Sequence, residues 1–212
     1  MKAKSSPASI TLDPASLAQV QLGARHTAML DAARLECGGN APWRHRKQAE
    51  ALELCRLAEA SGRMVIGQID LRVEIRVDLL LQVTVACLPN PSEPPVVAEA
   101  ARLGVTYREE AVVLPQPGFS FVQILAPQQV WSPSVSSGLV QALCLGTKLP
   151  AGIPLREIIL MTYGALTMMS TQMDPANSAG VLNVAAAEWF QRNPSWIPLS
   201  NAPFLKPAEA SV

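Results

Sequence analysis

Charged residues are scarce in this 212-residue chain, at 16%, and aromatic residues are scarcer still, at 5%. Seventeen basic residues balance seventeen acidic ones, so the net charge is zero. This balance excludes a strongly basic nucleic-acid binder driven by phosphate attraction, and the lack of aromatic rings argues against a base-stacking platform. Hydrophobic residues make up 49%, which is enough to bury a sizeable core and excludes disorder throughout. The length fits one large domain, or one ordinary domain with an extension.

Clustered metal ligands are also missing. The four cysteines lie far apart with no Cys-x-x-Cys pair, and the two histidines, His26 and His45, both fall in the N-terminal quarter. We therefore expect no zinc site. The longest apolar runs fall far short of the roughly 20 residues that a membrane span needs, and no signal peptide is recognisable. These absences predict a soluble, cytoplasmic protein with reduced thiols and no membrane or nucleic-acid partner.

The periodicity of apolar residues changes twice along the chain. Helical spacing predicts helices over 15–36, 42–60, 96–102, 155–169 and 182–191. Alternation predicts a long hairpin over 64–87, bent near Asp78, and two further strands over 107–114 and 119–125. Helices first, strands in the middle and helices last is the pattern of an α+β protein.

Cys144 is the thiol whose position favours chemistry. It follows an irregular stretch rich in proline and serine, and the two residues after it are Leu145 and Gly146. Nucleophilic thiolates work best in partly exposed positions at such breaks, although free cysteine is also among the most buried residue types. A cysteine hydrolase would need His26 or His45 as its base, and both are distant in sequence. The other three cysteines are expected to pack as small hydrophobic residues.

Short motifs occur in a definite order on both sides of Cys144. They are Pro94-Pro95-Val96, Ser132-Pro133-Ser134-Val135, Ser136-Ser137-Gly138, Cys144-Leu145-Gly146, the proline-opened run 149–157, Asp174-Pro175-Ala176-Asn177, and a tail with Leu182-Asn183, Trp189-Phe190 and Pro194-Ser195-Trp196-Ile197-Pro198-Leu199. This order resembles that of ubiquitin-conjugating enzymes, in which a Pro-Pro-Val-type turn and a His-Pro-Asn loop precede the active cysteine. The tail is similar to that of bacterial relatives encoded beside ubiquitin-like proteins, activating enzymes and deconjugating proteases in antiphage operons. The resemblance covers roughly 48–199 and is specific only from 132 to 196.

The chain departs from the family pattern in three places. Ser132-Pro133-Ser134 stands where the family has His-Pro-Asn, so the asparagine that supports the loop or the oxyanion is absent there. Two extra residues separate that loop from Cys144, and 98–121 has the character of an insertion. Ser134 offers one hydrogen bond in place of the asparagine, with a shorter reach.

The resemblance implies an α+β, ubiquitin-conjugating-enzyme-like fold: an antiparallel β-meander flanked by helices, with an N-terminal helical extension. It divides the chain into a tail and extra helix over 1–41, the conjugating-enzyme-like domain over 42–200, and a C-terminal tail over 201–212.

The same resemblance implies a function. Cys144 would accept a ubiquitin-like protein as a thioester from an activating enzyme and pass it to an amine on a protein target, in bacterial antiphage defence. The chain needs no cofactor for this, because the activating enzyme uses the ATP. The alternative is a catalytically silent scaffold of the same fold that binds a ubiquitin-like protein or a partner enzyme.

Supporting residues follow from the same resemblance. Asp174 or Asn177 is a candidate to orient the incoming amine, against the alternative of a cap or turn residue. Arg44, Arg46 and Lys47 lie where the family's first helix meets the activating enzyme, against the alternative of a solvated helix face.

Overall fold

An antiparallel sheet of five strands organises the fold, in the order β1-β2-β5-β7-β8. The structure is a computed structural model that describes residues 14–174 and 180–205. The strands of this sheet are β1 Met64–Asp70, β2 Ile75–Leu81, β5 Ala101–Tyr107, β7 Val122–Ala126 and β8 Gln141–Leu143. Two smaller pairings accompany it, β3 Val85–Cys87 with β4 Val96–Ala98 and β6 Gln116–Pro117 with β9 Lys148–Leu149.

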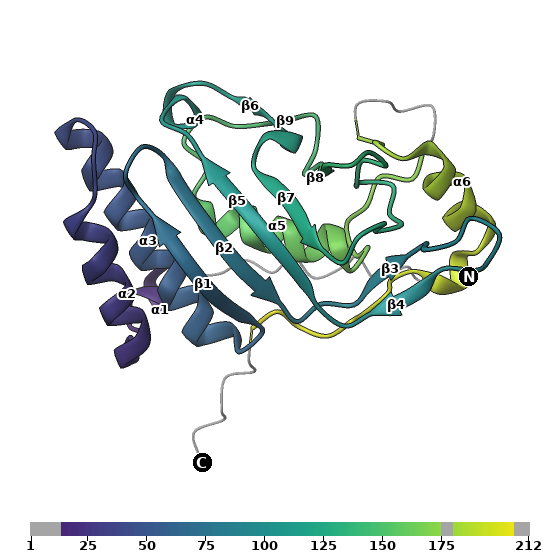
Figure 1. The fold of residues 1–212 in the computed structure, drawn as a ribbon, viewed down its shortest axis with the longest axis horizontal. Helices are drawn as coiled ribbons and strands as arrows, with labels where there is room; N and C mark the ends of the chain where they lie inside the picture. The colour runs from purple at the N-terminus through teal and green to yellow at the C-terminus, as the bar shows by residue number, and fades with distance from the viewer. Residues whose placement is uncertain (1–13, 175–179, 206–212) are drawn as a thin grey trace, which may run out of the picture.

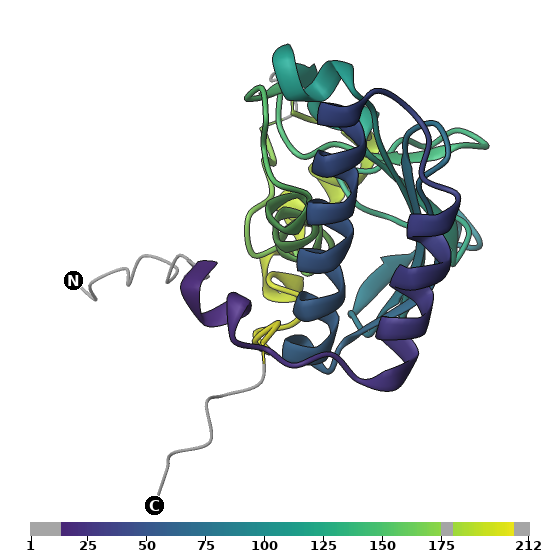
Figure 2. The ribbon, with the colours of Figure 1, turned by 90° about the vertical axis from the view of Figure 1, so that its left-hand side faces the viewer.

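Helices cover one face of this sheet and leave the other open (Figure 1). The helices are α1 Pro14–Ala18, α2 Ala24–Leu35, α3 Ala41–Ser61, α4 Glu110–Val113, α5 Leu155–Leu166 and α6 Val184–Arg192, with short 3₁₀ turns at Gly118–Ser120 and Pro194–Trp196. Helix α3 lies between α2 and α5, as the turned view shows (Figure 2). The predicted α+β class is confirmed.

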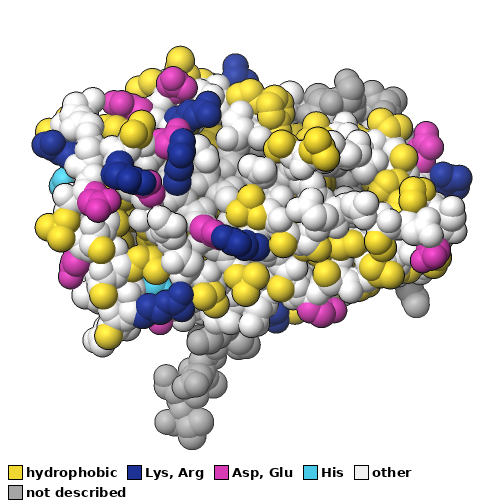
Figure 3. Space-filling model, in the orientation of Figure 1, with side chains coloured by type: hydrophobic (Ala, Val, Ile, Leu, Met, Phe, Trp, Pro, Cys, Tyr) yellow, Lys and Arg dark blue, Asp and Glu magenta, His cyan; other side chains and the backbone are white. Residues whose placement is uncertain are grey.

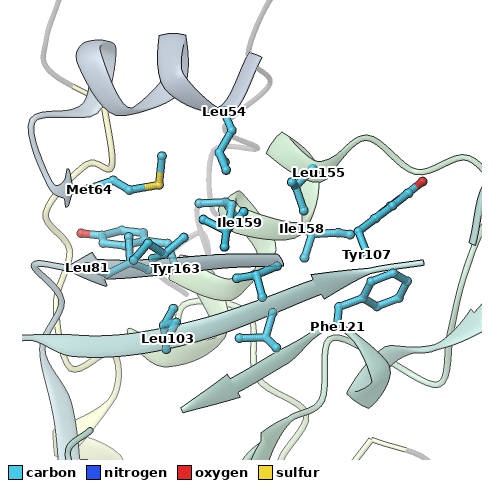
Figure 4. Close-up of a cluster of buried hydrophobic side chains, with 14 of the residues drawn as sticks. Leu54, Met64, Leu81, Leu103, Tyr107, Phe121, Leu155, Ile158, Ile159 and Tyr163 are labelled. Atoms are coloured by element: carbon cyan, nitrogen blue, oxygen red, sulfur yellow. The ribbon is translucent and has the colours of Figure 1, made fainter. Parts of the chain in front are cut away.

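The core lies between the sheet and helices α3 and α5. Leu54 of α3 and Ile158 and Ile159 of α5 point toward Leu81 and Leu103 on the covered face of the sheet (Figure 4). Strands β2 and β5 alternate buried and more exposed residues along their length, as expected when only one face is covered.

Helix α3 agrees closely with its sequence prediction. The Asn40 side chain caps it by accepting a hydrogen bond from the main-chain nitrogen of Trp43 at 2.9 Å, and Gly62 ends it in the left-handed conformation. Helices α5 and α6 also form where predicted, although α5 ends at Leu166, before the predicted limit of residue 169.

The single helix predicted over 15–36 is wrong, because the chain leaves the helical path between α1 and α2. The main-chain nitrogen of Gly23 donates to Glu59 Oε1 of α3 at 2.7 Å, so this contact with another helix replaces a helical hydrogen bond. Leu17 of α1 and Leu30 of α2 nevertheless join the same hydrophobic core as α3 and the sheet.

The predicted bend of the first hairpin near Asp78 is wrong as well. The turn lies between Asp70 and Ile75, and Asp78 sits in mid-strand on β2. Polar contacts define the true turn: Asp70 Oδ1 accepts a hydrogen bond from the Arg72 nitrogen at 2.9 Å. The alternation continues through the turn, so periodicity alone did not locate it.

The middle of the chain differs most from the prediction. Residues 96–102, predicted as a helix, form β4 and the start of β5, where pairing with β3 and β2 outweighs local helical preference. The strand predicted over 107–114 is wrong: β5 ends at Tyr107 and α4 follows it. The strand predicted over 119–125 corresponds to β7, which begins at Val122.

The residues after α6 return to the core. Phe204 is fully buried and packs edge-on against Tyr163 of α5, with ring centroids 5.1 Å apart. Part of the segment predicted as a C-terminal tail therefore contributes to the core. Among the described residues, none of the helices combines the length and the apolar character needed to cross a bilayer.

Candidate functional site

Cys144 lies directly after β8, in a loop that neighbouring segments hold in place. Its main-chain nitrogen donates to the carbonyl oxygen of Ser134 at 2.7 Å, and the nitrogen of Leu145 donates to the carbonyl oxygen of Gly118 at 3.3 Å. The thiol Sγ contacts the carbonyl oxygen of Gly146 at 3.3 Å. Gly146 has a φ of +121°, which only glycine adopts readily, so the chain turns sharply just beyond the thiol.

Cys144 is only 5% exposed as a residue, which is less than the partly exposed position expected for a nucleophile. It borders a cavity of about 350 Å³ between the β8 loop, α5 and the segment that follows α5. The cavity is lined by Ser134, Cys144, Leu145, Gly146, Met161, Ala165, Ser170, Gln172 and Gly180. None of these residues carries a charge or an imidazole, so the described lining of the cavity offers polar donors but no ionisable base beside the thiol.

The Ser132-Pro133-Ser134 loop lies beside Cys144, and Ser134 lines the same cavity. Ser132 and Ser134 are both buried, and the Ser134 nitrogen contacts Ser132 Oγ at 3.3 Å. The carbonyl oxygen of Pro133 accepts hydrogen bonds from Leu182 at 2.8 Å and Asn183 at 3.1 Å, which tie the loop to the start of α6. Ser134 therefore has a rigid main chain beside the thiol.

Asp174 is exposed and does not line the cavity. Its main-chain nitrogen donates to Gln172 Oε1 at 3.1 Å, so Asp174 contacts a residue that does line the cavity. Asn177, the other candidate for orienting an amine, lies outside the described residues.

The three basic residues of α3 do not form one exposed patch. Arg44 is exposed, but Arg46 pairs with Glu50 at 2.6 Å and donates to the carbonyl oxygen of Gly152 at 2.9 Å. Lys47 is fully buried, so its side chain is not accessible to a partner, contrary to its predicted place in a docking surface. Nothing in the sequence indicated this burial, because lysine is usually solvated.

The ammonium group of Lys47 instead binds the turn between β1 and β2. It donates to the carbonyl oxygen of Leu71 and to those of Arg72 at 3.4 Å and Val73 at 3.3 Å, and it lies 5.5 Å from the centre of the Trp43 ring. A buried cation is tolerable when carbonyl groups and a ring face replace its water.

The histidines do not support a hydrolase at Cys144. His26 Nδ1 lies 2.7 Å from Glu59 Oε1, between α2 and α3, and His45 is exposed on α3. Neither lines the Cys144 cavity. Burial raises the pKa of the Cys55 thiol to about 12 and also raises that of Cys87, so both thiols are poor nucleophiles near neutral pH.

A second hollow, of about 440 Å³, lies on the open face of the sheet. Its charged side chains are all paired: Glu74 contacts Arg76 at 2.7 Å and Arg108 at 3.2 Å, Asp70 contacts Arg72 at 2.6 Å, and Asp78 pairs with Arg102. Figure 3, which views this face, shows basic and acidic groups side by side on it. This pairing leaves no concentration of one charge to attract a charged ligand.

Gln172 was not among the site residues predicted from the sequence, although its position two residues before Asp174 was the available signal.

Within 14–174 and 180–205, no three His, Cys, Asp or Glu side chains are grouped as a metal site would require. Comparison with known proteins gave no match to a family model, to a curated protein or to a solved structure.

Proposed function

We propose that this chain carries a ubiquitin-like protein as a thioester on Cys144, within a ubiquitin-conjugating-enzyme-like fold. The observation that supports the proposal most directly is the position of Cys144. It lies in a loop held by main-chain hydrogen bonds, and it lines a cavity beside α5, a helix that Pro154 precedes. Along the chain, α3 is followed by an antiparallel meander, then by the Cys144 loop and α5. The sequence resemblance implies the same order.

The chemistry has two acyl-transfer steps. In the first, the Cys144 thiolate attacks the thioester carbonyl on an activating enzyme, the new thioester forms and the enzyme's thiolate leaves. In the second, an amine of a protein target attacks the Cys144 thioester, an amide forms, the Cys144 thiolate leaves and the amine proton passes to solvent. A thioester is already activated, so placement and removal of water serve this reaction without a neighbouring base.

Within this proposal the protein acts in the cytoplasm, in bacterial antiphage defence. Asp174 is the described candidate for orienting the amine, and Arg44 is the exposed basic residue on α3 for contact with the activating enzyme. ATP is consumed by that enzyme, not by this chain.

A charging assay tests the carrier role. The protein is mixed with ATP and with the activating enzyme and ubiquitin-like protein encoded beside it, and the products are separated on a non-reducing gel. We expect an adduct that reductant removes, that is lost in Cys144→Ala and that persists in Cys37→Ala, a matched control because Cys37 is a partly exposed thiol elsewhere. Absence of the adduct with a charged activating enzyme would overturn the carrier proposal.

The second candidate is the silent scaffold, and the 5% exposure of Cys144 favours it. A scaffold binds the ubiquitin-like protein or a partner enzyme without forming a covalent bond. Calorimetric titration separates the two candidates, because a scaffold retains full affinity in Cys144→Ala and forms no reducible adduct.

A further inference from the structure

The main chain next to Cys144 offers little to an oxyanion. The amide nitrogens of Cys144 and Leu145 already donate, to Ser134 and Gly118 respectively. Acyl transfer places negative charge on the carbonyl oxygen as the tetrahedral intermediate forms, and donors aimed at that oxygen lower the barrier. These two N–H groups are therefore engaged, so donors for an oxyanion at this thiol have to come from other groups that line the cavity, side chains among them.

Three lining side chains carry a hydrogen-bond donor: Ser134, Ser170 and Gln172. The hydroxyl of Ser134 sits on a short, buried side chain in a loop that is tied to α6. Ser170 Oγ packs against Gly164 of α5, where an added Cβ would lie 2.8 Å from that oxygen. Gln172 has the longest reach of the three and carries two N–H bonds on its amide nitrogen.

The orientation of the Gln172 carboxamide is set by its own main chain. Gln172 Oε1 accepts hydrogen bonds from the nitrogens of Met173 at 2.9 Å and Asp174 at 3.1 Å. Both partners are N–H donors, so the oxygen must face them and the amide nitrogen Nε2 must lie on the opposite side. Nε2 donates to no other residue in the described part of the chain, and the side chain borders the Cys144 cavity.

We propose that Gln172 Nε2 donates a hydrogen bond to the oxyanion that forms on the thioester carbonyl at Cys144. This assignment rests on the acyl-carrier function proposed for Cys144. It makes Gln172 a catalytic residue, with Met173 and Asp174 holding its carboxamide in place through their main-chain nitrogens.

The experiment acylates the protein without protein partners, in a Cys37→Ala background. The probe is the 2-mercaptoethanesulfonate thioester of N-acetylglycine: the Cys144 thiolate attacks its carbonyl and mercaptoethanesulfonate leaves. Excess probe is removed, free lysine is added, and intact-mass spectrometry follows the loss of the acyl group with time. Acylation that is absent from Cys144→Ala identifies the thiol that carries the group.

Two substitutions separate donation from structure. Gln172→Ala removes both roles, whereas Gln172→Glu keeps an acceptor for Met173 and Asp174 and removes the N–H donor. We expect both to slow discharge by about tenfold or more, below the ~10²–10³ typical of rigid oxyanion holes because Gln172 is exposed. Gln128→Ala, at an exposed glutamine whose Nε2 donates to Leu125, is the control and should discharge at the wild-type rate.

Discharge of Gln172→Glu within twofold of the wild-type rate would overturn the assignment, because a purely structural role survives in that variant. Failure of the carrier function shows in a different experiment, the charging assay with the activating enzyme. Since the small thioester requires neither protein partner, the two proposals can fail independently.

Discussion

Gly118 packs so closely against Gly146 that a Cβ on Gly118 would lie 2.1 Å from the Gly146 carbonyl oxygen. That oxygen is also the contact of the Cys144 thiol, at 3.3 Å. Residues 98–121, which have the character of an insertion in the sequence, include the sheet strand β5, and the part of them after β5 supports the loop that carries the candidate nucleophile.

Gly118→Ala should destabilise the protein, because the added methyl group must displace main-chain atoms on both sides of the contact. We expect the free energy of unfolding to fall by about 1–3 kcal/mol in urea denaturation, the usual cost of overpacking. Gly138→Ala is the matched control, since an added Cβ there meets nothing within 4 Å. Equal stability of the two variants would contradict the close contact.

Lys47→Met tests the buried ammonium group. The substitution keeps most of the side-chain volume but leaves the carbonyl groups of the β1–β2 turn without their donor, so we expect a loss of about 2–4 kcal/mol in the free energy of unfolding at pH 7. Arg44→Met, on an exposed part of the same helix, should change it by less than about 0.5 kcal/mol. A Lys47→Met protein as stable as Arg44→Met would show that the ammonium is not needed to hold the turn.

The environment of Asp70 predicts that the free energy of unfolding falls at acid pH. Hydrogen bonds from the Arg72 side chain and main chain lower the pKa of the Asp70 carboxyl to about 2, from an ordinary value of 3.8. A lowered pKa in the folded state means that the ionised carboxylate stabilises the fold above about pH 4, and this contribution is lost as the pH falls toward 2.

Asp70→Asn should therefore flatten the dependence of the free energy of unfolding on pH between about 4 and 2. Urea denaturation at several pH values measures this slope. The wild-type protein, measured under the same conditions, provides the reference slope. If Asp70→Asn keeps the wild-type slope, the interaction with Arg72 does not lower the pKa of Asp70 in the folded state relative to the unfolded state.

Phe204→Ala tests whether the residues after α6 belong to the core. Removing this fully buried ring should cost about 3–5 kcal/mol, because the cavity left beside Tyr163 cannot fill completely. Phe119→Ala, at a ring that is 53% exposed, should cost much less. Thermal unfolding of the two variants gives the comparison, and similar midpoints would mean that the C-terminal segment adds little to stability.

The site was partly predictable from sequence. Cys144, the serine loop and the proline before α5 stood out because they are local motifs, and the structure brings Ser134 next to Cys144. The proximity of Gln172 to Asp174 in the sequence was the only signal for it, because its place at the cavity depends on which way a side chain points after a helix ends. Asp174 is near Gln172 in sequence but does not line the cavity.

Local sequence signals were enough to predict the α+β class, the limits of α3 and the positions of α5 and α6, because helix caps and apolar periodicity act over a few residues. Long-range contacts were needed to separate α1 from α2, to place 96–102 in β4 and β5, and to bury Lys47. These outcomes rest on Gly23 meeting Glu59, on strand pairing, and on the carbonyl groups around Lys47. Each joins residues well separated along the chain, where the free energy of a long-range contact outweighs the local preference of the residues that make it.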